Sequence, residues 1–330
     1  MQQTEFRAFR VNQEDDAFSA QVEHLTTDDL PAGDLLIKVH YSSVNFKDAM
    51  TAVPDSKIAQ KHPLTPGIDL AGEVVESSHA GYVKGDQVIA TSYEIGVSHD
   101  GGYSEYARVP AEWTVPLPSG ITLEESMVFG TAGFTAALSI DLLEKQGITP
   151  EDAPILVTGA TGGVGSMAVA MLSHLGYEVV ASTGKEAEGY LKELGASDVI
   201  SRKSVYDGNL KPIGKQKWAA AVDPVGGEPL ASILSHLKYG GAAAVSGLTA
   251  GTQVPTAVFP FILRGVSLLG ADSVNCPMER RQHIWNRLAS DMKPENKLDT
   301  MKDMITLEDL PNALSTISEG QARGRMVVKL

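Results

Sequence analysis

The sequence predicts an α/β protein in which a doubly wound parallel sheet is joined to a mostly β domain. Three observations support this prediction. Strand-like and helix-like segments alternate from Ile155 onward, a glycine-rich turn follows the first of these strands, and short β-type runs fill the chain from Arg7 to about Ser119. Alternating strands and helices are typical of a parallel sheet covered by helices.

The composition is that of an ordinary globular protein. The 330 residues are enough for roughly two domains, and 43% are hydrophobic against 21% charged. The single cysteine, Cys276, excludes an intrachain disulfide and a four-cysteine zinc site, and it fits a reducing compartment. The chain starts with no basic and apolar export signal, so we expect a cytoplasmic protein.

The charge disfavours nucleic acid as a partner. The formal net charge is −14, from 27 Lys and Arg against 41 Asp and Glu, and no dense basic run counters it. A small anion can still bind, because backbone N–H groups and a few local cations outweigh a distant, screened field. The apolar stretch from Ala153 to Tyr177 contains five glycines and is a poor candidate for a membrane span.

Elements of the first domain are predicted from alternating apolar residues and turn residues. Strands are expected at Leu35–Val39, Ala71–Val75 and Gln87–Ala90, with turns at Pro31–Asp34 and Lys84–Asp86 between them. This pattern predicts a compact, mostly β domain.

A change of pattern near Ile121 indicates a boundary. Thr122 is a good N-cap, Glu124 and Glu125 suit a first helical turn, and an apolar helix is expected from Met127 to Leu143. We therefore divide the chain at residues 1–122, 123–264 and 265–330, the last part returning to the first domain.

The second domain shows strands and helices in strict alternation. Strands are expected at Ile155–Thr158, Glu178–Ser182, Val199–Ile200, Ala219–Asp223 and Ala242–Ser246, and helices at Val164–Leu175, Glu186–Leu194 and Pro229–Leu237. After the run Ser267–Gly270, a helix at Met278–Met292 and a strand at Met326–Lys329 are expected, and these could belong to either domain. The result is a Rossmann-type doubly wound sheet.

The turn after the first strand of this sheet predicts a dinucleotide site. It consists of Gly159, Ala160, Thr161, Gly162, Gly163, Val164 and Gly165 and opens a helix of small residues. Glycines there let the backbone approach a pyrophosphate, and the helix start offers unpaired N–H groups to the anion. The alternative is a glycine turn that only packs tightly.

The second strand indicates which dinucleotide is bound. NAD enzymes usually place an acid at its end, for the ribose 2′-hydroxyl, but the chain reads Ala181, Ser182, Thr183, Gly184, Lys185. Hydroxyls, Lys185 and the nearby Arg202 suit a 2′-phosphate, so we predict NADPH. Alternatively, Lys185 and Arg202 are ordinary surface cations.

A polar cluster in the first domain, Tyr41–Asp48, leads to a resemblance. This stretch is similar to the medium-chain dehydrogenase/reductase superfamily, in its quinone-oxidoreductase-like branch that includes acrylyl-CoA reductases. The resemblance covers essentially the whole chain, and its other matching stretches are Thr65–Asp69, Gly85–Val88, Gly130–Thr135, Val157–Gly165, Pro260–Arg264 and Gly324–Arg325.

The resemblance implies a Rossmann domain inserted into a GroES-like catalytic domain, a homodimer, and an active site between the two domains. It also implies an NADPH site lined by Tyr41, Ser182, Thr183, Gly184, Arg202, Leu248, Ile262 and Ser273, with Leu248 and Ile262 as apolar walls. Core packing is the alternative for these two. Zinc-dependent members have ligands where Asn45 and Ile68 stand, so no metal is expected here.

Without a metal, the resemblance implies hydride transfer from NADPH to an electron-poor C=C. We take Tyr41, Asn45, Lys47 and Asp48 as catalytic candidates: Tyr41 or Asn45 to hydrogen-bond a developing enolate, and Lys47 to donate a proton. Alternatively, Tyr41 is a packed strand residue, and Lys47 and Asp48 are a solvated pair at a helix start.

Three functions follow. The leading one is reduction of a short 2-enoyl thioester such as acryloyl-CoA, with a quinone as the alternative acceptor. A thioester would need cations for the CoA phosphates, and the candidates are Arg264, Arg280, Arg281 and Arg323. The third is a non-catalytic dinucleotide-binding homologue.

Overall fold

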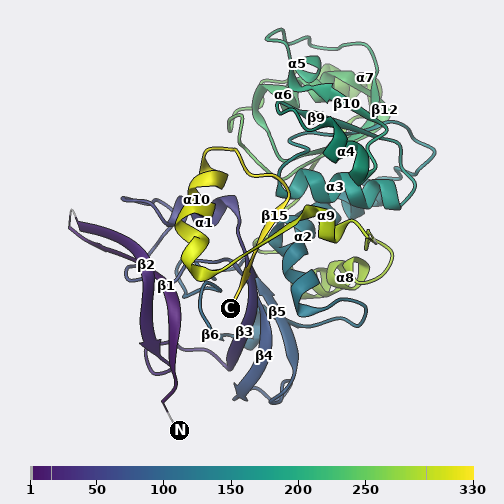
Figure 1. Cartoon of the computed structure of the whole chain (residues 1–330). Coiled ribbons are helices and arrows are strands. Elements are labelled where there is room, and N and C mark those ends of the chain that lie inside the picture. The colour runs from purple at the N-terminus through teal and green to yellow at the C-terminus, as the bar shows by residue number, and fades with distance from the viewer. Residues whose placement is uncertain (1–2, 16, 295) are drawn as a thin grey trace. The chain divides into compact units, whose positions relative to one another are not determined.

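The computed structural model describes residues 3–15, 17–294 and 296–330 and divides into two compact units (Figure 1). Unit 1 comprises Met1–Thr131, Val274–His283 and Met301–Leu330, and unit 2 comprises Ala132–Ser273 and Ile284–Thr300. The boundaries predicted after residues 122 and 264 stay predictions, and each unit is described by itself below.

Unit 1 is mostly β, as the sequence predicts. Its helices are α1 (Phe46–Thr51), α10 (Leu310–Ser318) and the 3₁₀ turns η1 (Ala111–Trp113) and η2 (Leu307–Asp309). Its strands are β1 (Glu5–Glu14), β2 (Ala17–Thr26), β3 (Leu35–Ser43), β4 (Asp69–Ser77), β5 (Gln87–Thr91), β6 (Tyr106–Val109), β7 (Thr114–Pro116), β14 (Lys302–Ile305) and β15 (Arg325–Lys329).

The main sheet of unit 1 brings the two ends of the chain together. Its strand order is β14-β15-β3-β4-β5-β7, with β6 also paired to β3, while β1 and β2 form a separate hairpin. Val327 on β15 lies opposite Ser43 on β3, and Ser42 lies opposite Leu70 on β4. The end of β3 is therefore flanked by the starts of β4 and β15.

Unit 2 contains the predicted parallel sheet. Its strands are β8 (Ile155–Val157), β9 (Val179–Thr183), β10 (Asp198–Ser201), β11 (Trp218–Asp223), β12 (Leu237–Val245) and β13 (Ser267–Gly270). Its helices are α3 (Gly163–His174), α4 (Glu188–Leu194), α5 (Arg202–Val205), α6 (Gly227–His236) and α7 (Phe259–Arg264). Helices α2 (Leu123–Lys145), α8 (Met278–Leu288) and α9 (Leu298–Met301) each have residues in both units.

The strand order of this sheet identifies a ligand-binding edge. The order is β10-β9-β8-β11-β12-β13, with all pairs parallel, so the chain proceeds outward from β8 in one direction and then from β11 in the other. Ligands of doubly wound sheets bind at such a reversal, beside the carboxyl ends of the two central strands. The predicted fold class, a Rossmann sheet with a GroES-like β domain, is confirmed.

Helix α2 differs from the uninterrupted helix that we predicted. Thr122 caps it, since its hydroxyl accepts a hydrogen bond from the Glu125 N–H at 3.1 Å, but Gly130 breaks the helical backbone with φ of 50°.

Among the described residues, α2 is the one helix whose length and apolar composition meet the requirements of a membrane span. Its most apolar window is 89% buried within the protein, which is typical of a core helix.

Candidate functional site

The glycine turn of unit 2 lies between β8 and α3, at the central edge of the sheet. Gly159 has φ of 53°, a left-handed conformation that glycine adopts without a Cβ clash. The Ala160 N–H donates to the Ser182 carbonyl at 3.1 Å, and the Gly162 N–H donates to the Gly159 carbonyl at 2.9 Å. These bonds connect the turn to the end of β9.

The start of α3 is open to an anion. Its N-cap is Gly162, which has no side chain to occupy the free N–H groups of the first turn. A Cβ on Gly165 would lie 2.3 Å from the Gly159 carbonyl oxygen, so only glycine lets the helix approach the turn this closely. A close backbone turn with free N–H groups fits a pyrophosphate.

Asp223 supports this turn from the neighbouring strand, and the sequence analysis gave it no role. It ends β11, accepts a short hydrogen bond from the Thr158 hydroxyl, and accepts another from the Gly226 N–H at 2.8 Å. Burial raises the pKa of Asp223. Thr158 directly follows β8, so its hydrogen bond to Asp223 connects the ends of β8 and β11, where the order of the sheet reverses.

At the end of β9, the predicted ribose-site residues lie together. Ser182 and Thr183 are buried, and the Thr183 hydroxyl accepts from the Lys185 N–H at 3.0 Å. A Cβ on Gly184 would lie 3.1 Å from the Arg202 Cδ and 3.2 Å from its Nε, so the Arg202 side chain lies across this glycine. The exposed Arg202 guanidinium is therefore close to the strand end, as a 2′-phosphate site requires.

The three remaining cofactor candidates of unit 2 differ in exposure. Leu248 and Ile262 are 61% and 69% exposed, so neither packs in the core of the unit. Ser273 is buried just after β13. Their assignment to the cofactor site stays a prediction.

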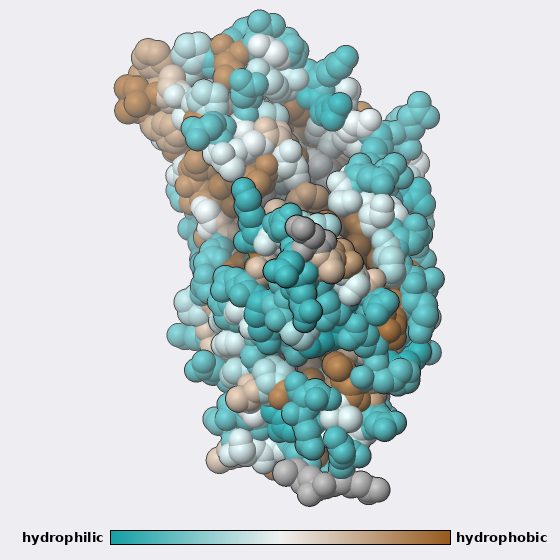
Figure 2. Space-filling view, turned by 90° about the vertical axis from the view of Figure 1, so that its left-hand side faces the viewer, coloured by the Kyte–Doolittle hydropathy of each residue, from teal (hydrophilic) through white to brown (hydrophobic). Residues whose placement is uncertain are grey.

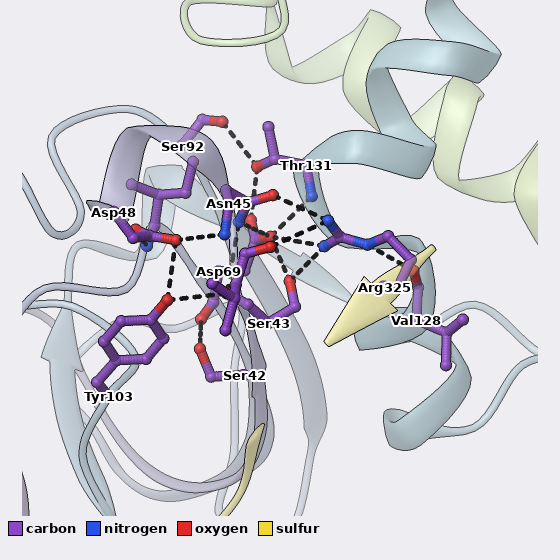
Figure 3. A network of polar contacts seen from close by, with 12 residues as sticks. Ser42, Ser43, Asn45, Asp48, Asp69, Ser92, Tyr103, Val128, Thr131 and Arg325 are labelled. Atoms are coloured by element: carbon purple, nitrogen blue, oxygen red, sulfur yellow. Dashed lines mark hydrogen bonds and ion pairs between the residues drawn. The ribbon is translucent and has the colours of Figure 1, made fainter. Parts of the chain in front are cut away.

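Unit 1 contains a buried polar network at the end of β3, with Asp48 on one side (Figure 3). Its carboxylate accepts from the N–H of Asn45 at 2.8 Å, the N–H of Ile68 at 2.9 Å and the hydroxyl of Tyr103 at 3.0 Å. Burial and the nearby Asp69 carboxylate raise the pKa of Asp48 to about 7. The Asp48 side chain is fully buried, and it holds Asn45 through the backbone N–H.

Asp69 is the centre of this network. It accepts from the Ser43 hydroxyl at 2.6 Å, from Asn45 Nδ2 at 2.8 Å, and from both the N–H and the hydroxyl of Thr131, at 2.8 and 2.5 Å. The Arg325 guanidinium lies 3.9 Å from Asp69 and donates to Asn45 Oδ1 at 3.3 Å. The buried Asp69 carboxylate and the buried Arg325 guanidinium are thus paired with each other, and both are hydrogen-bonded.

Gly130 permits the close approach of Thr131 to this network. A Cβ on Gly130 would lie 2.5 Å from both Asp69 Oδ2 and Ser43 Oγ, and 2.8 Å from Arg325 Nη2. The break in α2 therefore has a steric cause, and it directs the Thr131 N–H at Asp69.

The other two catalytic candidates lie at the edge of the network. Tyr41 is on β3, and burial together with the Glu124 carboxylate raises the pKa of its hydroxyl. Lys47 is half-buried on α1, and its amine makes no ion pair or hydrogen bond with any of the described residues. Tyr41, Asn45, Lys47 and Asp48 thus all belong to the end of β3 and the start of α1.

In the part of the chain that the structure describes, no group of three or more His, Cys, Asp or Glu side chains could hold a metal ion. Asn45 donates to Asp69, and Ile68 is a buried apolar residue whose N–H is bound to Asp48. Neither side chain is a zinc ligand.

Comparison with known proteins identifies the family. Residues 31–119 match the alcohol dehydrogenase GroES-like domain, and residues 163–290 match the domain described as zinc-binding dehydrogenase. A Bacillus subtilis protein named provisionally as quinone oxidoreductase YhfP is 55% identical over 99% of both chains. The chain belongs to the medium-chain dehydrogenase/reductase superfamily, in its zinc-free quinone-oxidoreductase-like branch.

Two further members of this superfamily are similar over nearly their full length. The acrylyl-CoA reductase AcuI of Ruegeria pomeroyi is 45% identical over 98% of each chain. The crystal structure of Escherichia coli YhdH with bound NADPH has a TM-score of 0.94 and 44% identity, over 98% of this chain and 99% of that one.

Two arginines that we considered for CoA phosphates have other roles in this superfamily member. Arg281 is fully buried, donates to the Thr91 carbonyl at 3.1 Å and stacks on the Tyr93 ring at 4.4 Å. Arg264 donates to the backbone carbonyls of Ser235 and Leu237, at 3.0 and 3.1 Å. Both guanidiniums are occupied by the protein itself, so this expectation was wrong for them.

The network residues Asp69, Thr131 and Arg325 were missed as functional candidates, although their motifs carried the family resemblance. A signal existed, because Asp69 and Arg325 each begin a strand and are followed directly by apolar residues. Charged residues in such positions are rarely buried unless they are paired. The pairing itself could not be inferred without knowing that β4 and β15 both flank β3.

Proposed function

We propose that this protein reduces the activated C=C of a short 2-enoyl thioester such as acryloyl-CoA. The chain is an NADPH-dependent oxidoreductase, and the substrate is the part that we propose. Hydride adds to the β-carbon of the thioester, a proton adds to the α-carbon, and the saturated thioester and NADP⁺ leave. The observation that carries the proposal is the 45% identity to an acrylyl-CoA reductase over 98% of each chain.

The residues of unit 2 fit an NADPH molecule. Gly165 keeps α3 against the turn, Gly162 leaves the first N–H groups free, and the Arg202 side chain lies across Gly184 where no acid would repel a 2′-phosphate. The reduced nicotinamide supplies the hydride when it is bound. We propose Leu248 and Ile262, both exposed, as the apolar surface for it.

The residues of unit 1 would orient the thioester and handle the proton. A developing enolate needs hydrogen-bond donors, and we propose Tyr41 or Asn45 for this role. Lys47 has an amine without a partner among the described residues, and we propose it as the proton donor. Asp48 is buried, and we propose that it holds Asn45 through the backbone N–H at 2.8 Å.

Steady-state kinetics separate the thioester from the alternative acceptor, a quinone, which is the substrate class in the provisional name of YhfP. We expect kcat/KM for acryloyl-CoA to exceed that for a simple quinone, and the opposite ratio would favour quinone reduction. Arg280 and Arg323 remain candidates for the CoA phosphates. Replacing Tyr41 and Asn45 in turn tests the assigned site, which fails if turnover of every accepted substrate is unchanged.

We also propose that the protein is a homodimer. The edge strand β13 pairs only with β12 among the described strands, and Leu268 on it is 40% exposed. Further exposed apolar side chains of unit 2 come from α7 and the residue before it: Val258, Phe259 and Leu263. Hydrophobic residues also gather in the upper left part of the surface in Figure 2. Open edges and exposed apolar side chains favour association.

A further inference from the structure

The Asn45 amide is held in one orientation by two opposite buried charges (Figure 3). Its nitrogen donates to Asp69 Oδ2 at 2.8 Å, and its oxygen accepts from Arg325 Nη1 at 3.3 Å. Rotating the amide by half a turn would place oxygen against the carboxylate and nitrogen against the guanidinium. Both contacts would then be repulsive, so the network determines the orientation of the Asn45 amide, with nitrogen toward Asp69 and oxygen toward Arg325.

One N–H of this amide is left without a strong partner. Asn45 Nδ2 carries two hydrogens, of which one goes to Asp69 and the other faces the Ser43 carbonyl at 3.4 Å, a long and weak contact. Asn45 is 8% exposed, whereas Asp69 has no exposed surface. Asn45 is thus the member of the pair that a ligand can reach.

The same charges polarise the amide. A guanidinium bound to the amide oxygen draws electrons toward that oxygen and makes the N–H a better donor, and hydrogen bonds in a chain strengthen one another in a buried site. Arg325 is held in place by three further partners, the carbonyls of Val128 and Val44 and the hydroxyl of Ser43, at 3.1, 3.1 and 2.8 Å. The cation is therefore fixed and needs no reorganisation.

We propose that Asp69 and Arg325 are positioning residues that present the Asn45 side chain as a hydrogen-bond donor to the carbonyl oxygen of the substrate. The inference rests on the proposed function in assigning Asn45 to the reacting centre. It goes beyond that function because it assigns roles to two residues that do not touch the substrate. A donor directed at this oxygen stabilises the enolate that forms as hydride arrives.

A double-mutant cycle with Asn45→Ala and Asp69→Asn tests the proposal. We expect Asn45→Ala to lower kcat by about 100-fold, the usual effect of losing one such donor. Asp69→Asn should lower kcat by about 10-fold or more alone, and by less than about twofold in the Asn45→Ala background, because residues that act through each other are not additive. NADPH affinity should stay unchanged in all variants.

Ser42→Ala is the matched control. Ser42 is buried next to the network and donates to the backbone carbonyl of Asp69 at 2.6 Å, but it does not contact the Asp69 carboxylate or the Asn45 amide. It should reduce stability without reducing kcat. If Asp69→Asn lowers kcat equally in both backgrounds, Asp69 does not act through Asn45 and the proposal is overturned.

Two provisions keep the test decisive. If Asp69→Asn does not fold, Arg325→Lys takes its place, since it keeps the charge and removes the contact with Asn45. If quinones but not thioesters are reduced, the proposed function fails, and the cycle is run with a quinone.

Exchange of the Asn45 side-chain amide protons with solvent, measured by NMR without substrate, gives a second test. It should accelerate at least about tenfold in Asp69→Asn, and an unchanged exchange rate overturns the proposal.

Discussion

Replacing Gly165 by alanine is expected to weaken NADPH binding sharply. The new Cβ would lie 2.3 Å from the Gly159 carbonyl oxygen and 2.7 Å from the Ala160 Cα, both backbone atoms that cannot rotate away. Ordinary contact begins at 3.4 Å, so α3 and the turn must separate by about 1 Å. Overpacking of this kind usually costs about 1–3 kcal/mol of folding stability.

The effect on affinity follows from the displaced N–H groups. A hydrogen bond to a charged group contributes about 1.5–3 kcal/mol, and a shift of about 1 Å loses most of one such bond. We therefore expect the Kd for NADPH, measured by nicotinamide fluorescence, to rise about 10- to 100-fold.

Gly189→Ala is the control for this substitution. Gly189 lies on α4 in the same unit, has open space around its Cα, and should gain roughly 0.5–1 kcal/mol of stability with unchanged Kd. A Gly165→Ala protein that binds NADPH within twofold of the wild type would refute the assignment of this turn to the pyrophosphate.

Three further predictions concern the cofactor specificity, the buried carboxylate and the dimer. Arg202→Ala should raise the Kd for NADPH about tenfold or more and leave that for NADH unchanged, since a guanidinium bound to phosphate is lost; equal effects on both would contradict the 2′-phosphate site. Because the pKa of Asp48 is raised from 3.8 to about 7, its contribution to stability is full below about pH 4 and is lost as the pH rises through 7. In urea unfolding, the free energy of unfolding of the wild type should therefore fall relative to that of Asp48→Asn as the pH rises from about 4 to 7, by up to about 1.4 kcal/mol per pH unit. A difference between the two proteins that does not change with pH would contradict the raised pKa. Leu268→Asp should convert a dimer to monomers in sedimentation experiments, and an unchanged mass would exclude β13 from the interface.

The Rossmann half of the fold is predictable from local pattern alone. A run such as Ile155–Val157, buried on both faces and followed by glycines and a helix of small residues, has few alternatives. Most predicted bounds there agree with the structure to within two residues. However, β12 begins at Leu237 rather than at Ala242, α8 ends at Leu288 rather than at Met292, and the short helices α5 and α7 were not predicted. The break of α2 at Gly130 was missed because its cause lies in Asp69 and Ser43, far away in the sequence.

The buried polar network at the end of β3 is less predictable for the same reason. Asn45 and Asp48 are neighbours in sequence and were singled out together, but Asp69 and Arg325 reach Asn45 only because β4 and β15 flank β3. Pairing of distant strands depends on tertiary contacts that periodicity does not encode. Arg281 illustrates the converse error, since it was considered for the CoA phosphates although its side chain is fully buried.

The central claim is that hydride from NADPH adds to the β-carbon of a 2-enoyl thioester. The most direct measurement is mass spectrometry and NMR of the product formed from acryloyl-CoA and NADPH that carries deuterium at both C4 positions of the nicotinamide. We predict propionyl-CoA with one deuterium, located at the β-carbon. No propionyl-CoA, or propionyl-CoA without deuterium at that carbon, would contradict the account.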